Sequence, residues 1–240
     1  MTTEHVLVIG GGSGMGLALA ELLLAGGAEV TIAGRSADRL AAAAKLLDRP
    51  DRLRTGPVDV GREDQVRRLL ASVGPVHHIA VTAADAAGSA APLAEFDLDD
   101  ARALADTKLF GPWLVAKHAR GYLAPAGSLT FTSGVAAQRP SPGTSMTAAV
   151  NGALEALARA LALELAPIRV NAVAPGWTDT PLWDTIAGDG RHDRLAAMAA
   201  RLPTGRVGRA VDVAQAFVAL MRNGHITGAV VPVDGGQRLV

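Results

Sequence analysis

Short runs rich in Val, Ile and Ala alternate with longer helical patterns along the whole 240-residue chain, which leaves few folds open. The strand-like runs are continuously apolar, as is typical of strands buried on both faces of a parallel sheet. Repeated β-α-β units with right-handed crossovers build such a sheet and cover it with helices. The pattern predicts strands at His5–Ile9, Glu29–Ala33, Leu53–Val58, Val76–Thr82, Gly127–Thr132, Ile168–Val173 and Ala229–Val233. It predicts helices at Met15–Ala25, Ala37–Leu47, Glu63–Val73, Asp97–Gly121, Thr147–Leu165 and Val211–Arg222. Pro112 marks a point of irregularity in the long helical pattern over Asp97–Gly121.

Composition narrows the class of protein. The chain has no cysteine, which excludes disulfides, thiolate metal sites and cysteine nucleophiles. Its 23 basic and 23 acidic residues balance, so we expect neither nucleic acid nor a membrane surface as a partner. The start MTTEHVLVIGGG lacks the basic segment of a signal peptide, and no uncharged run is long enough to span a membrane. We therefore expect a cytoplasmic protein.

No linker, repeat or charge block divides the chain, so residues 1–240 are expected to form a single domain. Residues 178–209 stand apart, because they are rich in Gly, Pro, Thr and Arg and lie between the last two strand patterns. A long irregular segment in a compact domain is usually functional. We interpret 178–209 as a lid over a substrate.

A glycine-rich turn, Gly10-Gly11-Gly12-Ser13-Gly14-Met15-Gly16, joins the first strand to the first helix. In such a turn, backbone N–H groups and a helix N-terminus face a pyrophosphate. The usual dinucleotide fingerprint has glycines at i, i+2 and i+5, whereas Gly10, Gly14 and Gly16 fit i, i+4 and i+6. No Lys-Ser or Lys-Thr follows, which excludes a Walker A loop. The alternative is a tight turn that binds no ligand.

Together with three further motifs, this turn resembles that of the short-chain dehydrogenase/reductase family, in its classical type. The motifs are Val58-Asp59-Val60, Pro175-Gly176 with Thr180 four residues on, and Thr227-Gly228 followed by Val233-Asp234-Gly235-Gly236. One departure is Ile9, where the family usually has threonine. The resemblance covers nearly the whole chain. It implies a Rossmann-type doubly wound sheet of seven parallel strands with helices on both faces, and a nicotinamide dinucleotide as cofactor.

The resemblance also assigns the residues that hold the cofactor. Asp59 and Val60 would lie at the adenine ring, and Ala83 and Ala84 fall in a stretch where the family has Asn-Asn-Ala-Gly. The whole implied set is Gly10, Gly12, Ser13, Gly14, Met15, Gly16, Asp59, Val60, Ala83, Ala84, Pro175, Gly176, Thr178 and Thr180. Family members also pair through the helix at Thr147–Leu165, so the resemblance implies a homodimer or homotetramer.

Residues Arg35 and Ser36, which follow the second strand, bear on the choice of dinucleotide. An acidic residue there would accept a hydrogen bond from a ribose 2′-OH and repel a 2′-phosphate. A guanidinium and a hydroxyl suit a phosphate instead. We therefore expect NADP(H) rather than NAD(H). The alternative is that Arg35 only covers the adenine ring or is solvated.

The catalytic centre departs from the family pattern. Family members protonate the substrate from a tyrosine, with a lysine four residues on, a serine and an asparagine. Ser133 matches the serine, but the tyrosine and lysine positions hold Met146 and Val150. The single tyrosine, Tyr122, has alanine four residues after it, so Tyr-x-x-x-Lys is absent from the chain.

Lys108 stands where the family has its asparagine, in a chain with three lysines and 20 arginines. A lysine, unlike an arginine, can lose its proton when it is desolvated. We hypothesise that Lys108 partly replaces the missing pair, as proton donor or ribose anchor. The alternative is that it fills space or faces solvent.

Two of the three tryptophans, Trp177 and Trp183, flank the Pro-Gly segment and the lid, and with Met146 they would line an apolar substrate pocket. Core packing is the other explanation.

Two functions remain open from the sequence. The first is an atypical NADP(H)-dependent oxidoreductase acting on a small, apolar carbonyl, imine or enone. The second is an inactive dinucleotide-binding protein that serves as a sensor or scaffold subunit.

Overall fold

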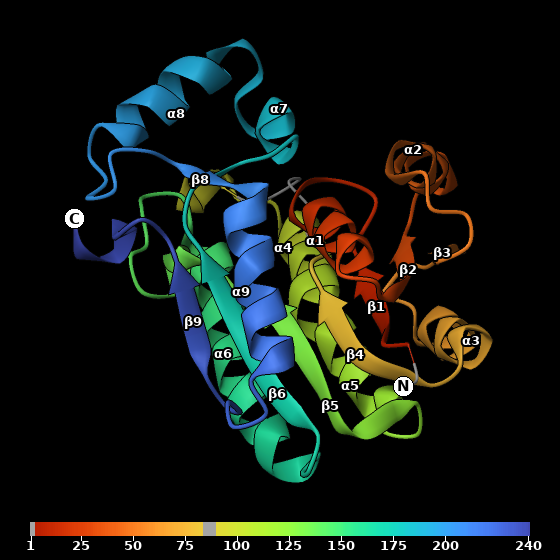
Figure 1. Cartoon of the computed structure of the whole chain (residues 1–240). Coiled ribbons are helices and arrows are strands. Elements are labelled where there is room, and N and C mark those ends of the chain that lie inside the picture. Colours follow the sequence, from red (N-terminus) through yellow and green to blue (C-terminus); the bar gives the residue numbers. More distant parts are fainter. Residues whose placement is uncertain (1–2, 84–89) are drawn as a thin grey trace.

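The computed structural model describes residues 3–83 and 90–240, and within them seven parallel strands form one sheet in the order β3-β2-β1-β4-β5-β6-β9 (Figure 1). The strands are β1 (His5–Ile9), β2 (Glu29–Gly34), β3 (Leu53–Pro57), β4 (Val76–Val81), β5 (Leu123–Thr132), β6 (Arg169–Pro175) and β9 (Val230–Val233). The doubly wound fold expected from the alternation and the resemblance is confirmed. The strands begin and end close to where the apolar runs predict, except that β5 begins at Leu123 rather than at the predicted Gly127.

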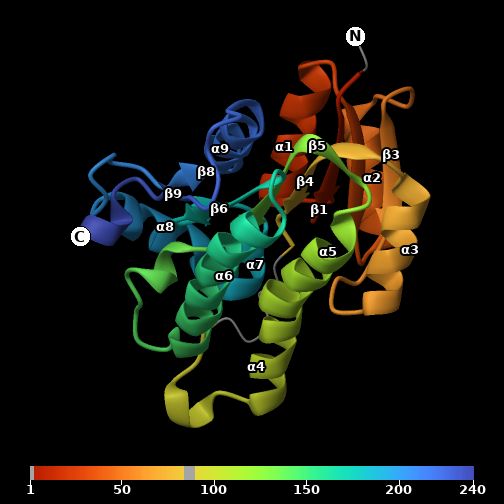
Figure 2. The same ribbon diagram turned by 90° about the horizontal axis from the view of Figure 1, so that it is seen from below.

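Helices cover both faces of the sheet. On one face pack α1 (Gly14–Ala25), α2 (Ala37–Leu47) and α9 (Ala210–Arg222). On the other pack α3 (Glu63–Val73), α5 (Gly111–Ala119) and α6 (Ser145–Glu164). Figure 2 shows α1 and α9 on one side and α5 and α6 on the other. Burial of Leu, Val and Ala from both faces against strands that are themselves apolar supplies the main stabilising free energy of the fold.

The single helix predicted over Asp97–Gly121 is wrong in one respect. The structure has α4 (Leu98–Ala105), a π-helical turn at Asp106–Phe110, and then α5. Pro112 lacks the N–H that would bond the carbonyl of Lys108 in a regular helix, so the hydrogen-bond ladder cannot continue unchanged. Gly111 lets this turn approach the loop after β3, because a Cβ there would lie 2.7 Å from a methyl group of Val60. Lys108 is at the centre of the turn.

Residues 178–209 are also more regular than predicted. They contain β7 (Thr178–Asp179), α7 (Leu182–Ala187), α8 (Arg191–Ala199) and β8 (Gly208–Arg209). The two helices are short and are separated by a turn at Gly188–Gly190, which hides their period in the sequence. β7 and β8 pair in parallel, so the two ends of the segment lie side by side. Figure 1 shows α7 and α8 at the top of the view, outside the layers that cover the sheet.

In the described part of the chain, no helix combines the length and the apolar character that crossing a membrane requires.

Candidate functional site

The candidate site lies at the carboxyl ends of the central strands. β1 is bordered by β2 on one side and β4 on the other, so the order of the strands reverses between β1 and β4. Open α/β sheets bind ligands at such a reversal. The glycine-rich turn follows β1 there, and Gly10 and Gly11 donate to the carbonyl of Ala33 at 2.7 and 3.2 Å.

The turn is built by close approaches that only glycine allows. Gly10 has φ +94°, and a Cβ on it would lie 2.5 Å from the backbone N of Ala83. A Cβ on Gly16 would lie 2.5 Å from the hydroxyl oxygen of Thr82. Gly14 has φ +53°, and its Cβ position lies 3.4 Å from Thr180, so the turn also meets the segment after β6. The predicted cofactor residues of these three segments are thus brought together.

The first turn of α1, a helix that the structure describes completely, contains no acidic residue. Ser13 is its N-cap, and the Ser13 hydroxyl caps no N–H group in the described chain. Gly12 precedes this position and Met15 lies in the first turn. The uncompensated N–H groups and the helix dipole suit an anion at this point. The cradle therefore fits the pyrophosphate of a dinucleotide.

Arg35 lies exposed directly after β2, and Ser36 caps α2 by accepting a hydrogen bond from the backbone N of Arg39 at 3.2 Å. The cap uses a lone pair of the Ser36 oxygen and leaves its O–H as a donor. The carbonyl of Ala33 accepts hydrogen bonds from the glycine turn, and Arg35 follows Ala33 by two residues. Arg35 and Ser36 therefore lie at the same carboxyl edge of the sheet as the glycine turn.

Asp59 shapes the loop after β3. Its Oδ1 accepts from the N of Gly61 at 3.0 Å, and its own N donates to Gln65 at 2.9 Å. Val60 is buried against Gly111, so this loop and the π-helical turn are in contact. Of the alanine pair predicted at the cofactor, Ala83 lies against Gly10, whereas Ala84 is outside the described residues.

The segment after β6 is held by the C-terminal signature. A Cβ on Gly176 would lie 2.8 Å from Asp234, and Trp177 donates its N–H to Gln237 at 2.9 Å. Thr178 donates its hydroxyl to the carbonyl of Gly176 at 3.0 Å. Pro175 is the last residue of β6 and is buried. This segment is thereby fixed between the sheet and the base of residues 178–209.

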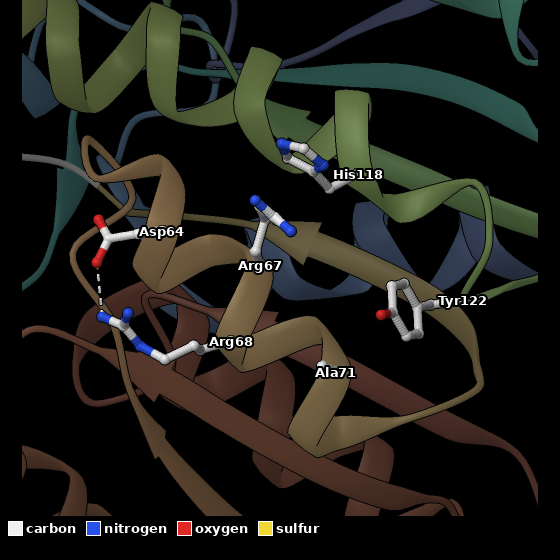
Figure 3. A pocket seen from close by; sticks show the side chains of 6 residues that line it. All are labelled: Asp64, Arg67, Arg68, Ala71, His118 and Tyr122. Atoms are coloured by element: carbon white, nitrogen blue, oxygen red, sulfur yellow. Dashed lines mark hydrogen bonds and ion pairs between the residues drawn. The ribbon is translucent and has the colours of Figure 1, made fainter.

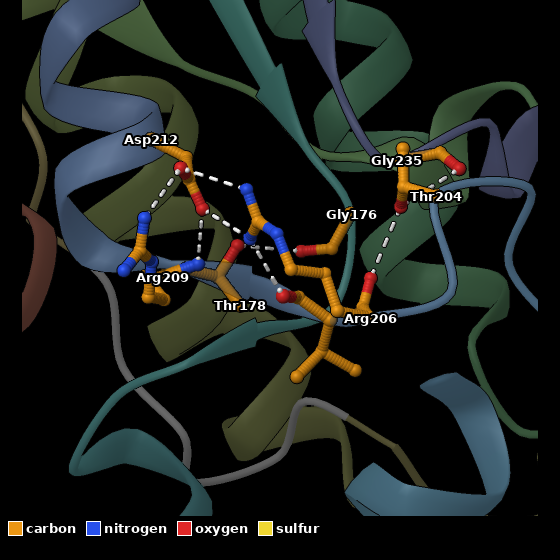
Figure 4. Close-up of polar contacts among 8 residues, drawn as sticks. Gly176, Thr178, Thr204, Arg206, Arg209, Asp212 and Gly235 are labelled. Carbon is orange, nitrogen blue, oxygen red and sulfur yellow. Dashed lines mark hydrogen bonds and ion pairs between the residues drawn. The ribbon is translucent and has the colours of Figure 1, made fainter. Parts of the chain in front are cut away.

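The far end of residues 178–209 is fixed by an arginine. Arg206 donates two hydrogen bonds to Asp212 of α9, at 2.6 and 3.0 Å, beside Thr178 and Gly176 (Figure 4). The hydrogen bonds from Arg206 lower the pKa of Asp212. The Thr204 hydroxyl donates to the carbonyl of Arg206 at 3.2 Å, and the Thr204 backbone N–H donates to the carbonyl of Gly235 at 3.3 Å. Both ends of residues 178–209 are therefore tied to the body of the domain.

Lys108 and Ser133, the two predicted catalytic residues, lie side by side. Lys108 Nζ donates to the backbone carbonyl of Ser133 at 3.2 Å and to Asn151 Oδ1 at 2.8 Å. The ammonium is thus directed at the residue that follows β5 and at α6, and the residue as a whole is partly buried. Burial of the ammonium lowers the pKa of Lys108 to about 8.

The hydroxyl of Ser133 is directed at α6. Its Oγ lies 2.9 Å from Glu155 Oε1 and 3.4 Å from the backbone carbonyl of Asn151, and the residue is 2% exposed. A hydroxyl has one proton to donate, and a carboxylate is the stronger acceptor. Ser133 therefore presents lone pairs rather than its proton to a neighbouring group.

Asn151 and Glu155 were missed in the sequence. They lie four residues apart, one turn of helix, and both reach the predicted catalytic residues. The available signal was two polar residues at helical spacing in a stretch otherwise rich in Ala and Leu.

The tryptophans are packed against each other. The ring centroids of Trp177 and Trp183 are 4.4 Å apart, and Trp183 donates Nε1–H to the carbonyl of Thr178 at 3.0 Å. Trp183 is 8% exposed, so most of its surface serves packing at the base of residues 178–209. Met146 lies in the first turn of α6 and is partly buried.

A surface groove of about 390 Å³ lies elsewhere, between α3 and the end of α5 (Figure 3). It is lined by Asp64, Arg67, Arg68, Ala71, His118 and Tyr122. None of these residues belongs to the candidate site.

The fold and the site together define a class, the doubly wound dinucleotide-binding domain with its glycine turn at the strand-order reversal. A family model described as enoyl-(acyl carrier protein) reductase matches residues 10–238. The chain belongs to the short-chain dehydrogenase/reductase family, whose members are oxidoreductases that bind a nicotinamide dinucleotide.

Two relatives illustrate the similarity. The short-chain dehydrogenase/reductase malC of Malbranchea aurantiaca is 36% identical over 254 residues, covering 98% of this chain and 95% of the relative. The cis-4-hydroxycyclohexanecarboxylate dehydrogenase of Sinomonas cyclohexanicum is 36% identical over 250 residues, covering 99% and 98%.

Solved structures agree with this fold. The MalC reductase/Diels-Alderase of Malbranchea aurantiaca superimposes with a TM-score of 0.92 at 35% identity, covering 99% of this chain and 97% of that one. A small-chain dehydrogenase in complex with NADPH gives a TM-score of 0.85 at 31% identity, and each chain is covered completely.

Proposed function

We propose that this chain is an NADP(H)-dependent oxidoreductase with an atypical proton donor, acting on a small, apolar carbonyl, imine or enone. The observation that carries the proposal is the position of Lys108. Its ammonium lies beside Ser133 at the end of β5, and no tyrosine or lysine is present in the first turns of α6. The names of the NADPH-bound dehydrogenase and of the MalC reductase support this class of activity.

The cofactor residues divide by the part of the dinucleotide that each would hold. The glycine turn with Ser13 and Met15 would bind the pyrophosphate, and Asp59, Val60, Ala83 and Ala84 would border the adenosine half. Pro175, Gly176, Thr178 and Thr180 would hold the nicotinamide half. Arg35 and Ser36 would bind a 2′-phosphate, which favours NADP(H) over NAD(H). The exposure of Arg35 at the rim, and the O–H that Ser36 retains while capping α2, support that preference.

When bound in its reduced form, the nicotinamide supplies a hydride. The protein must then supply the proton that completes the reduction, and Lys108 is the donor placed to do so. An ammonium has three N–H groups, of which the described chain engages two. The third would be directed at the substrate oxygen or nitrogen, or at the carbanion carbon of a reduced enone. After the transfer, the neutral amine takes a proton from solvent.

Ser133 would then border the substrate and offer it only the lone pairs of its hydroxyl oxygen, because the hydroxyl proton is donated to Glu155. Trp177, Trp183 and Met146 would line the apolar side of the substrate pocket. Residues 178–209 would form the lid within a single domain of residues 1–240. We further propose a cytoplasmic homodimer or homotetramer that binds a small-molecule substrate.

The second candidate is a dinucleotide-binding protein without turnover, a sensor or scaffold subunit. The observation that favours it is the burial of Ser133 at 2% exposure with its hydroxyl already engaged. General acid catalysis contributes about 10²- to 10⁴-fold in rate, so its partial loss leaves room for slow turnover of an activated substrate.

The discriminating experiment follows NADPH absorbance with a panel of carbonyls, imines and enones. The oxidoreductase consumes NADPH with at least one compound, and Lys108→Met lowers that rate by about 10²- to 10⁴-fold. NADPH binding without consumption on any compound would favour the second candidate.

A further inference from the structure

Asn151 is the polar residue among the buried residues of α6, a helix described over its whole length. The other buried residues of α6 are Val150, Leu154, Ala158 and Leu161. Asn151 itself is 2% exposed. Burying an amide costs free energy unless its polar atoms are hydrogen-bonded. The hydrogen-bond partner of Asn151 therefore explains why an asparagine is stable at this buried position.

The side chain of Asn151 fits between two neighbouring segments. Its Oδ1 accepts a hydrogen bond from Lys108 Nζ at 2.8 Å, on the π-helical turn. Its amide also packs against Gly134, where a Cβ would lie 2.8 Å from Nδ2. Gly134 therefore leaves the space that the amide occupies, directly after Ser133. The absence of a side chain at Gly134, just after β5, thus makes room for the amide of Asn151 on α6.

The two described acceptors of Lys108 are both uncharged, namely the amide oxygen of Asn151 and the backbone carbonyl of Ser133. Among the described residues, Lys108 forms no ion pair. A neutral acceptor fixes the position of an ammonium. Unlike a carboxylate, it does not strongly stabilise the protonated, charged form over the neutral amine. This is the arrangement that a proton donor requires, because the donor must release its proton.

We propose that Asn151 is the positioning residue for Lys108, which holds its ammonium beside Ser133 and, as an uncharged acceptor, keeps it able to release a proton. This inference rests on the proposed function for its consequence in catalysis. The placement itself can be tested without turnover. Glu155, one helical turn further on, positions the Ser133 hydroxyl by accepting its hydrogen bond.

The test uses the small number of lysines. Protein carrying ¹³C at lysine Cε gives three signals to assign, because the chain has only Lys45, Lys108 and Lys117. Lys45→Arg and Lys117→Arg identify the signal of Lys108. Its chemical shift is followed from pH 6 to 11 in the full chain without cofactor.

In the wild type, the Lys108 signal is expected to titrate near the pKa of about 8 that burial produces. Asn151→Asp preserves the size of the side chain and is expected to raise the midpoint by about 1 to 3 pH units. Asn223→Asp, at an exposed position after α9, adds the same charge and should leave the midpoint unchanged. A Lys108 midpoint that stays within about 0.3 pH units of wild type in Asn151→Asp overturns the proposal, since opposite charges in contact shift it by more than that.

If Asn151→Asp does not fold, Asn151→Ala serves as the second variant. It removes the acceptor, so the midpoint should fall below that of the wild type, and an unchanged midpoint again overturns the proposal. Thermal shift with NADPH on the same samples separates the two proposals. Failure to bind NADPH refutes the proposed function, while the lysine titration still reports on Asn151.

Discussion

The protonation state of Lys108 should set the pH dependence of turnover. Burial lowers its pKa to about 8, far below the usual value for lysine. With that pKa, about 90% of the side chain is protonated at pH 7 and about 10% at pH 9. If the ammonium donates the proton that completes reduction, the rate should fall about tenfold over this interval, and about tenfold for each further pH unit.

The assay is single-turnover oxidation of bound NADPH, from pH 7 to 10, with the compound from the panel that consumes NADPH fastest. The 2′-phosphate has its second pKa near 6, so it stays ionised throughout and does not contribute to the fall. Lys117→Met is the matched control, because Lys117 is an exposed lysine on α5 that pairs with Glu63. It should keep the wild-type profile. A rate that stays flat between pH 7 and 9, or a Lys108→Met variant whose rate falls in the same way, would show that Lys108 is not the proton donor.

Three further predictions follow from other parts of the structure. Arg35→Asp should weaken NADPH binding about 10- to 100-fold and leave NADH binding unchanged or stronger, as measured by calorimetry, because hydrogen bonds to charged groups are worth about 1.5–3 kcal/mol. Gly16→Ala should abolish dinucleotide binding and lower the free energy of unfolding by about 1–3 kcal/mol, since its Cβ would overlap the turn. The control is Gly152→Ala on α6, which meets nothing within 4 Å and should be neutral or stabilising in the same denaturant titration. Burial lowers the pKa of His78, so the unfolded chain binds more protons, and stability to urea should fall as the pH drops below about 6.5, less so in His78→Gln.

The sheet could be predicted because its determinants are local. Each buried strand is a short apolar run, and the pairing of parallel strands follows from their alternation with helices. The glycine turn could also be predicted from the sequence, because close contacts within the first β-α unit and with Thr82 require glycine at positions 10 and 16. Such features depend on neighbouring residues or on the fold class alone.

The environment of Lys108 could not be predicted in the same way. The π-helical turn arises where Pro112 interrupts the ladder, and the pattern of apolar residues does not reveal such a turn. The partners of Lys108 are residues 25 and 43 positions away, one directly after β5 and one on α6. Asn151 and Glu155 read as ordinary polar residues of a helix until the packing of α6 shows which way they point.

Residues 178–209 show a second kind of limit. Their helices are too short for a periodic pattern to emerge, and Gly188 and Gly190 suggest irregular chain. Their two ends are joined by the pairing of β7 with β8, which places Thr178 and Asp179 beside Gly208 and Arg209. This pairing joins two short strands at opposite ends of the segment, and no local pattern in the sequence connects them.

Thermal unfolding of the full chain with NADPH and with NADH measures whether a dinucleotide binds at the glycine turn and whether Arg35 binds its 2′-phosphate. Saturation at about one hundred times the dissociation constant should add about 2.7 kcal/mol to the free energy of unfolding. We predict a clear rise in melting temperature with NADPH and a much smaller one with NADH at the same concentration. A melting temperature that neither nucleotide raises would show that the glycine turn does not bind a dinucleotide.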